Sequence, residues 1–398
     1  MKIAVIGAGA SGITAAIYAK RVNPSNSVTV IERSDRILKK ILSTGNGRCN
    51  LSNAVIAEDN YYSQSPDAIT KILTAFTPCE ERQFFEELGI MFCEESSRIY
   101  PYSKKASAVC DALRFEVERL GIKVILNTRV KEIKKASQGF IINNLKYDRV
   151  IISAGGSAAP IFGTDGNSFN LLKSLGHRIT PVFPALVPIK TKENTASLKG
   201  IRANCAITLI KNGISVKKEE GELQLTQYGL SGIAIMQLSR LTQKGDIIEI
   251  DLIPHLLEDE VTKHLFNRAV LLKERRIEDF LTGILHKPLA MYIYKELSIP
   301  LDLKAENLTK KDIINLSKKL KALRFTAVST LSWEDAQVTA GGALLDEFDL
   351  STLESKICPG LYCTGEALDC VGDCGGYNLH WAWTTGAISG KAAGKGEN

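Results

Sequence analysis

Short apolar runs alternate with amphipathic stretches over the first half of the chain. Apolar runs bounded by turn residues predict buried strands, and apolar residues at helical spacing predict helices. The predicted strands lie at 3–6, 28–31, around 124 and at 150–153, and the predicted helices lie at 11–21, 79–88 and 106–120. This alternation is typical of an α/β fold with a doubly wound parallel sheet.

The middle of the chain follows another pattern. Prolines at 181, 184 and 188 mark a junction, and the segments 205–210 and 247–252 then predict a small antiparallel sheet or barrel. From about 258 to 321 apolar residues recur at helical spacing, and strand-like sequence resumes after Arg324. We therefore expect an α/β domain built from both chain ends (1–185 and 325–398), a β-rich insert (186–255) and a helical subdomain (256–324).

The first predicted strand leads into a glycine-rich turn with the sequence GAGASG at residues 7–12. Gly7 would permit the tight turn, Gly9 would let the backbone approach a pyrophosphate, and Gly12 would let the next helix pack close to the sheet. The second strand ends at Glu32, twenty residues beyond Gly12, where a carboxylate can accept hydrogen bonds from an adenosine ribose. The segment predicts a dinucleotide site.

Further strand-to-glycine turns follow the strands at 150–153 and 361–364, and a glycine pair at 375–376 precedes a helix predicted to run to about 393. The dipole end of that helix can stabilise negative charge on the pyrimidine end of a reduced flavin. A domain that binds only a nicotinamide dinucleotide does not need residues from the C-terminal end of the chain at its cofactor site. The pattern therefore favours FAD. The cofactor-binding candidates in these turns are Ala154, Gly155, Gly365, Glu366, Gly376, Tyr377, Asn378 and Leu379.

Composition narrows the class of protein. The chain has 398 residues, 44% of them hydrophobic, and a net charge of +6, so it can bury a large core. Its lysines are scattered and lack interleaved aromatic residues, so we expect no nucleic-acid partner. The sequence shows neither a signal peptide nor an apolar run of membrane-spanning length, so we expect a cytoplasmic protein without membrane contact.

The nine cysteines are odd in number and lack paired spacing, so we expect reduced thiols and no disulfide framework. Cys370 and Cys374 stand beside Asp369 and Asp373, but two cysteines at this spacing without histidine are a poor zinc pattern. We expect no metal site.

Four motifs carry a family resemblance. They are TGNGRCNLSN at 44–53, GTDG at 163–166, YGLSG at 228–232 and GDCGGYNL at 372–379, the last followed by Trp381 and Trp383. With them the chain resembles the BaiN-like family of NAD(P)/FAD-dependent oxidoreductases, which includes aminoacetone oxidase. Two details depart from the family pattern: Cys370 stands where an aliphatic residue is usual, and the GTDGN loop at 163–167 varies a loop that the family more often writes with another glycine.

The resemblance implies a three-domain flavoprotein with a Rossmann-type, glutathione-reductase-like FAD-binding domain, a β-rich insert and a helical subdomain. It also implies that one set of residues binds the adenosine half of FAD and another set lies along the flavin half. Ala10, Ser11, Glu32, Arg33 and Val130 would help to hold the adenosine half, while Arg48, Cys49, Asn50, Gly365, Asn378 and Leu379 would lie along the flavin half.

Three residues are candidates for the chemistry, although no catalytic residue follows from the sequence. Arg48 could neutralise the reduced flavin or a substrate carboxylate, or it could clamp its own loop. Cys49 could be a redox thiol, but it lacks a CxxC partner, which favours a packing role. His380, at the start of the last helix, is a possible acid.

Several functions remain open. No second GxGxxG pattern occurs between residues 130 and 330, so NAD(P)H would dock transiently at the flavin. One hypothesis is NAD(P)H-linked reduction of an unsaturated small molecule through flavin N5, as in bile-acid-reducing members of the family. Another is an oxygen-linked oxidase of small amines such as aminoacetone. A third, of another class, is a flavin-binding redox sensor or RNA-associated flavoprotein. The oligomeric state does not follow from the sequence.

Overall fold

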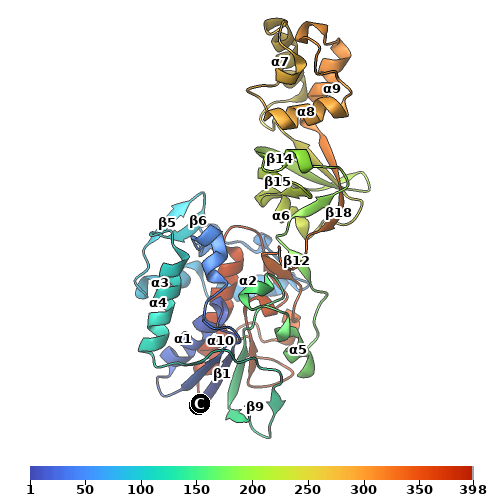
Figure 1. Cartoon of the computed structure of the whole chain (residues 1–398). Helices are drawn as coiled ribbons and strands as arrows, with labels where there is room; N and C mark the ends of the chain where they lie inside the picture. The colour runs from blue at the N-terminus through green and yellow to red at the C-terminus, as the bar shows by residue number, and fades with distance from the viewer. Residues whose placement is uncertain (397–398) are drawn as a thin grey trace. The chain divides into compact units, whose positions relative to one another are not determined.

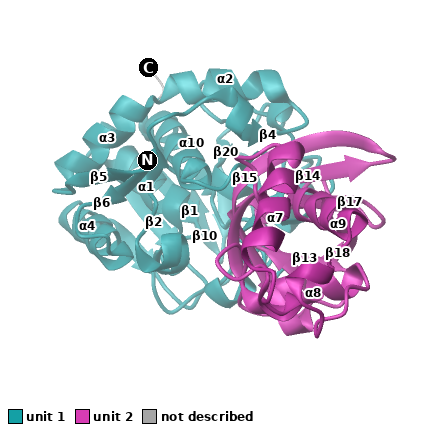
Figure 2. Ribbon diagram, turned by 90° about the horizontal axis from the view of Figure 1, so that it is seen from above, with its two compact units in different colours: residues 1–185, 333–398 teal, residues 186–332 magenta. Residues whose placement is uncertain are grey.

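The computed structural model describes residues 1–396. The chain divides into two compact units (Figure 2). Unit 1 consists of residues 1–185 and 333–398, and unit 2 consists of residues 186–332. Each unit has its own hydrophobic core. Both ends of the chain belong to the first unit.

A parallel five-stranded sheet forms the centre of unit 1. Its order is β20 (Leu361–Cys363), β11 (Arg149–Ile152), β1 (Lys2–Ile6), β2 (Ser27–Ile31) and β7 (Lys123–Ile125). Alternate residues of β1 enter different cores, Ala4 and Ile6 on one face and Ile3 and Val5 on the other. A strand buried on both faces reads as a continuous apolar run, so the predicted α/β fold with a parallel sheet is confirmed.

Two helices from opposite chain ends pack together beside the sheet, α1 (Ala10–Val22) and α10 (Tyr377–Gly394) (Figure 1). Glycines at 386, 390 and 394 of α10 face the backbone of Ser11, Ala15 and Ala19 of α1. Because both helices present small residues at every fourth position, their backbones come into direct contact.

The remaining helices of unit 1 are α2 (Pro66–Ala75), α3 (Pro78–Glu87), α4 (Ala106–Arg119) and α5 (Asn167–Ser174). Helix α3 begins at a capping box, in which Thr77 Oγ1 accepts from the amide of Glu80 and the Glu80 side chain accepts from the amide of Thr77. The predicted helices at 79–88 and 106–120 are confirmed as α3 and α4.

Small antiparallel sheets complete unit 1. One consists of β3 (Ser52–Asn53), β6 (Arg98–Pro101) and β5 (Phe92–Glu95), and another of β8 (Lys134–Lys135), β9 (Phe140–Ile142) and β10 (Leu145–Tyr147). Two strand pairs join β4 (Tyr61–Tyr62) to β21 (Val371–Gly372) and β12 (Phe183–Ala185) to β19 (Val338–Ala340).

Unit 2 contains a closed antiparallel barrel. Its order is β13 (Ile189–Thr191), β16 (Gly229–Ser231), β15 (Ile214–Thr226), β14 (Arg202–Lys211), β17 (Ile247–Asp251) and β18 (Leu323–Thr330). The sequence pattern predicted that residues from 325 onward belong to the α/β domain, whereas β18 closes the barrel by pairing with β17 and β13. These pairings join residues more than seventy positions apart, which local sequence does not reveal.

The helices of unit 2 are α6 (Ile233–Ser239), α7 (Glu258–Leu271), α8 (Lys287–Glu296) and α9 (Lys310–Lys321). Helix α9 begins at a second capping box, formed by Thr309 and Asp312. Barrel residues such as Leu209 share one buried cluster with helical residues such as Leu265 and Leu316. The division of this unit into a β-rich and a helical domain stays a prediction.

Within residues 1–396, no helix is both long and apolar enough to cross a membrane. The nine cysteines all lie within these residues, and none of them forms a disulfide bond. The same part of the chain contains no cluster of three or more His, Cys, Asp or Glu side chains that could hold a metal ion.

Candidate functional site

The carboxyl ends of three neighbouring strands bring the glycine-rich turns together. Ile6 of β1 pairs with Ile152 of β11, which pairs in turn with Cys363 of β20. The turns that follow these strands carry Gly7, then Ala154 and Gly155, then Gly365, and therefore share one edge of the sheet. This is the edge at which open parallel sheets bind ligands.

The glycines of the β1–α1 turn have different physical roles. Gly7 has φ +101°, and a Cβ atom there would lie 2.5 Å from the carbonyl oxygen of Ser153, so this turn requires glycine. A Cβ atom at Gly12 would lie 2.1 Å from the carbonyl oxygen of Gly7. At Gly9, by contrast, no atom lies within 4 Å of the Cβ position. Gly9 leaves an open backbone surface of the kind that a pyrophosphate needs.

Two helix N-termini at this site have no capping side chain among the described residues. Gly9 is the N-cap of α1 and Gly376 is the N-cap of α10, and neither helix has an acidic residue in its first turn. Free amides and the positive dipole end make each terminus a site for negative charge. Gly376, with φ +105°, packs so closely that a Cβ atom would lie 2.3 Å from the carbonyl oxygen of Ser52.

Glu32 lies directly after β2 and is 9% exposed. Its two carboxylate oxygens accept hydrogen bonds from the amides of Ala8 and Ser34, each at 2.7 Å. Glu32 therefore holds the glycine-rich turn in place, and its predicted contact with a ribose stays a prediction. The Cβ position of Gly163 lies 2.5 Å from Ser34 Oγ, so the GTDG loop borders the same corner.

The other adenosine candidates meet at that loop. Asp165 pairs with Arg33 at 2.6 Å and with Arg129 at 2.7 Å. The carbonyl oxygen of Val130 accepts a hydrogen bond from Asn167 Nδ2 at 2.9 Å. The structure thus gathers Glu32, Arg33 and Val130 around one loop, and their role in holding adenosine stays a prediction.

Gly365 links β20 to both helices. A Cβ atom at this position would lie 2.5 Å from Ser11 Oγ of α1, and the Gly365 amide donates to Thr385 Oγ1 of α10 at 2.9 Å. The indole nitrogen of Trp381 donates to its carbonyl oxygen at 3.2 Å. The end of β20, α1 and α10 are therefore held together at this residue.

Glu366 was predicted to contact the cofactor, and its carboxylate is engaged within the protein. Oε1 accepts from the Thr339 amide at 2.8 Å, and Oε2 pairs with Lys40 at 2.9 Å. The Cβ position of Gly156 lies 2.8 Å from Oε1. Glu366 therefore ties the turn after β20 to β19 and to Lys40.

The first residues of α10 support the turn that precedes the helix. The Asn378 side chain accepts from the Gly372 amide at 2.8 Å and donates to the carbonyl oxygens of Gly372 at 2.8 Å and Asp373 at 3.2 Å. Tyr377 packs edge to face on Tyr61 with ring centres 5.8 Å apart. These contacts leave the backbone amides of Tyr377, Asn378 and Leu379 as the groups that α10 offers to a ligand.

Arg48 is oriented by two neighbours. One guanidinium nitrogen lies 3.1 Å from Glu95, and the guanidinium carbon lies 4.7 Å from the centre of the Tyr100 ring. Of the two roles proposed for Arg48, these contacts favour the clamp that holds the loop.

Cys49 and Asn50 follow in the same loop. Cys49 is fully buried, and burial raises the pKa of its thiol to about 12, so the thiol is protonated at neutral pH. This favours packing over redox chemistry. Asn50 Oδ1 is buried and has no hydrogen-bond partner among the described residues. A buried acceptor of this kind needs a donor, which a bound cofactor can supply.

Thr364 has the same property and was not singled out from the sequence. It is fully buried between Cys363 and Gly365, and its Oγ1 has no hydrogen-bond partner within the described residues. Its position directly before a glycine–glutamate pair at a strand end is the signal that could have identified it. Open glycine, free helix ends and unpartnered polar atoms together fit a dinucleotide that carries a polar ring system.

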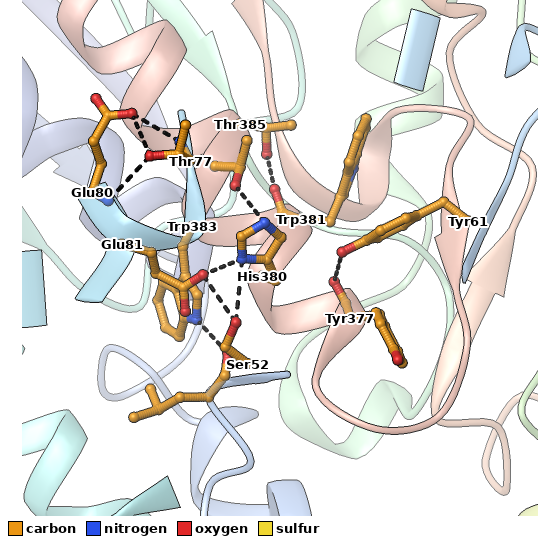
Figure 3. A network of polar contacts seen from close by, with 12 residues as sticks. Ser52, Tyr61, Thr77, Glu80, Glu81, Tyr377, His380, Trp381, Trp383 and Thr385 are labelled. Carbon is orange, nitrogen blue, oxygen red and sulfur yellow. Dashed lines mark hydrogen bonds and ion pairs between the residues drawn. The ribbon is translucent and has the colours of Figure 1, made fainter. Parts of the chain in front are cut away.

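His380 lies in a buried polar network (Figure 3). Its Nδ1 pairs with Glu81 Oε2 and lies 3.3 Å from Ser52 Oγ, and its Nε2 lies 3.4 Å from Thr384 Oγ1. Ser52 Oγ also donates to Glu81 Oε2 at 3.1 Å. Both ring nitrogens of the candidate acid are thus engaged inside the protein.

Glu81, which is 3% exposed and belongs to α3, was not among the predicted site residues. A signal was present, because positions 81, 84 and 85 share one helix face and the other two are phenylalanines. A carboxylate on an otherwise apolar face indicates a buried partner.

The whole chain matches known proteins. The family described as HI0933-like protein Rossmann domain matches residues 1–392. A 3-dehydro-bile acid delta(4,6)-reductase of Clostridium scindens is 36% identical, with 98% of each chain covered. A ribosomal RNA dihydrouridine synthase of Haemophilus influenzae is 29% identical, covering 96% of this chain and 95% of that protein.

Among solved structures, FrdA of Escherichia coli quinol fumarate reductase has a TM-score of 0.51 at 16% identity, covering 99% of this chain and 70% of the other. At this identity the likeness concerns the fold alone. The family resemblance inferred from the motifs is confirmed by the match over residues 1–392. The chain belongs to the HI0933-like family and is an FAD-dependent oxidoreductase with a Rossmann-type, glutathione-reductase-like FAD-binding fold.

Proposed function

We propose that this flavoprotein reduces a carbon–carbon double bond conjugated with a carbonyl group in a small cyclic molecule, with NAD(P)H as the electron donor. The observation that carries the proposal is the 36% identity, over 98% of both chains, with a protein named a 3-dehydro-bile acid delta(4,6)-reductase. Conjugation with a carbonyl polarises a double bond, so that its distal carbon accepts hydride and the adjacent carbon accepts a proton.

The residues of unit 1 have distinct tasks in this proposal. Bound FAD supplies a two-electron carrier that can pass hydride at N5. The amides at the start of α1 and the open backbone at Gly9 bind its pyrophosphate. The amides at the start of α10 stabilise negative charge on the pyrimidine ring. Asn50 Oδ1 and Thr364 Oγ1 accept hydrogen bonds from the cofactor.

The electron donor is proposed to dock at the flavin itself. The described residues contain one parallel sheet, and unit 2 is built on an antiparallel barrel. A second dinucleotide-binding βαβ unit is therefore absent from residues 1–396. NAD(P)H would bind transiently and leave before the unsaturated substrate enters.

A uridine in ribosomal RNA is the second candidate substrate. Its ring also contains a double bond conjugated with a carbonyl, so the reaction class is the same. One observation favours it: unit 2 carries 23 Lys and Arg against 17 Asp and Glu, whereas the residues of unit 1 carry 27 of each. The entire net charge of +6 thus lies in residues 186–332, and cationic surfaces favour RNA. This candidate runs against the expectation of no nucleic-acid partner.

The substrate class can be tested by reoxidation. Flavoprotein reduced anaerobically is mixed with a 3-oxo-4,6-diene steroid acid or with unmodified ribosomal RNA, and the oxidised flavin band is followed. The proposal predicts reoxidation by the dienone, with a product two hydrogens heavier, and none by RNA. Reoxidation by RNA with formation of dihydrouridine would establish the second candidate instead. Bleaching of the oxidised flavin by aminoacetone would overturn both.

A further inference from the structure

Two adjacent glutamates of α3 have opposite environments. Glu80 has a side chain 42% exposed, caps its own helix and pairs with Lys391 at 3.2 Å. Glu81 is 3% exposed and points toward α10 (Figure 3). A carboxylate buried to this degree is costly unless hydrogen bonds and an opposite charge compensate it. The residues around Glu81 must therefore compensate the burial of its carboxylate.

Both partners of Glu81 adjoin the N-terminus of α10. His380, which pairs with Glu81 through Nδ1, is the residue whose amide makes the first intrahelical hydrogen bond, to Gly376 at 2.9 Å. Ser52, which donates to Glu81 at 3.1 Å, has its carbonyl oxygen 2.3 Å from the position that a Cβ atom on Gly376 would take. Asn53 Nδ2 donates to the carbonyl oxygen of Gly375 at 2.9 Å.

These contacts connect three segments that are remote in the sequence. Helix α3, strand β3 and the first turn of α10 meet at one carboxylate. Asn50 lies two residues before β3, and its buried Oδ1 has no hydrogen-bond partner among the described residues. Movement of Glu81 would therefore shift the free amides of α10 relative to the segment that carries Asn50.

We propose that Glu81 is a positioning residue for the flavin end of the cofactor site. By holding His380 and Ser52, it fixes the first turn of α10, so that the amides of Tyr377 to Leu379 are preorganised for the negative charge that a reduced flavin carries. The inference rests on the proposed placement of the pyrimidine ring at the start of α10. It assigns no contact between Glu81 and the cofactor.

The test compares Glu81→Gln with Glu80→Gln. The two variants alter neighbouring residues of one helix by the same chemistry, but only the first changes the network of His380. For each FAD-loaded protein, the flavin midpoint potential is measured by anaerobic reductive titration, and the dissociation constant of FAD is measured by fluorescence. The thermal midpoint of each protein checks folding.

We expect Glu81→Gln to shift the potential to more negative values and to weaken FAD binding about tenfold, the effect of one buried hydrogen bond to a charged group. Glu80→Gln should leave both quantities at the wild-type value. Should Glu81→Gln fail to fold, Ser52→Ala, which removes one partner of the carboxylate, is expected to shift the potential in the same direction.

Unchanged potentials in Glu81→Gln and Ser52→Ala would overturn the inference, as would an equal shift in Glu80→Gln. These readouts need neither substrate nor NAD(P)H, so a wrong substrate assignment does not affect them. Failure of the wild-type protein to bind FAD would overturn the cofactor assignment itself, which is a different result.

Discussion

Gly390 of α10 lies against Ala15 of α1 so closely that a Cβ atom on the glycine would be 2.4 Å from the alanine carbonyl oxygen. Gly386 stands in the same relation to Ser11, at 2.4 Å. Because the residue numbers increase together, the two helices are parallel. Gly376 precedes Gly386 by ten residues, so the free end of α10 extends about 15 Å beyond this contact. The contact thereby sets the separation of the two helix ends proposed to bind FAD.

Substitution Gly390→Ala is expected to destabilise the protein. Alanine in an unobstructed helix interior is more stable than glycine by about 1 kcal/mol. At this position the methyl group meets the backbone of α1, and overpacking of this kind costs about 1–3 kcal/mol. Thermal unfolding should therefore show a lower midpoint. Gly396→Ala is the control, because no atom lies within 4 Å of the Cβ position at Gly396. Equal thermal midpoints for the two variants would contradict the close contact at Gly390.

Gly9→Ala should impair cofactor binding and leave the fold intact. Gly9 has φ −78° and ψ −168°, which alanine adopts, and no protein atom would touch the added methyl group. The methyl group would instead occupy the surface assigned to pyrophosphate. We expect the apoprotein to melt as wild type and FAD to bind about tenfold more weakly, a loss of about 1.4 kcal/mol. Wild-type affinity for FAD in this variant would show that the pyrophosphate does not bind at Gly9.

His177 should make stability depend on pH. Its ring accepts and donates within a buried cluster, with Nδ1 2.9 Å from Glu347 and Nε2 2.9 Å from Ser355. Burial lowers the pKa of His177 below its usual value, against the opposing effect of Glu347. The unfolded chain, with a histidine pKa of about 6.5, therefore binds the proton first as the pH falls. Stability from this group is complete above about pH 6.5 and is lost below it.

Urea unfolding at several pH values between neutral and acidic measures this effect. The decline in the free energy of unfolding below pH 6.5 should be smaller in His177→Gln than in wild type. His255 is exposed, so the free energy of unfolding of His255→Gln should decline with falling pH as that of the wild type does. Parallel curves for His177→Gln and wild type would show that the buried imidazole titrates normally.

Cys49 should resist thiol reagents in the native protein. The thiol is buried and its pKa is raised to about 12 by that burial, while Cys79 is exposed. Brief treatment with a maleimide at pH 8, followed by peptide mass spectrometry, should find label at Cys79 and little at Cys49. Equal labelling of the two cysteines would reopen a redox role for Cys49.

The parts of the site that depend on local sequence were predictable. Gly7, Gly9 and Gly12 lie in or directly after one turn, and the strand that precedes Glu32 pairs with the strand before that turn. Apolar runs buried on both faces identified the sheet. Parallel pairing then brings the turns after residues 6, 152 and 363 to one edge, which the sequence indicated through repeated glycines at strand ends.

Long-range partners could not be predicted. Glu81 meets His380 across 299 positions, and Glu366 meets Lys40 across 326, and in each case only the three-dimensional fold decides which carboxylate turns inward. The barrel strand β18 was assigned to the wrong side of the boundary for the same reason, because its pairing with β13 joins the two ends of the insert. Local patterns define elements, whereas packing selects the partners of their side chains.

The proposed NAD(P)H-linked reductase activity is tested most directly by an anaerobic titration of the purified, FAD-loaded protein with NADPH and then NADH, in which the visible flavin band is followed. We expect at least one of the two nicotinamides to bleach the band stoichiometrically and a conjugated dienone to restore it. A protein that dithionite reduces but neither nicotinamide does would contradict the proposed electron donor. A protein that remains colourless after incubation with FAD would contradict the assignment of the site itself.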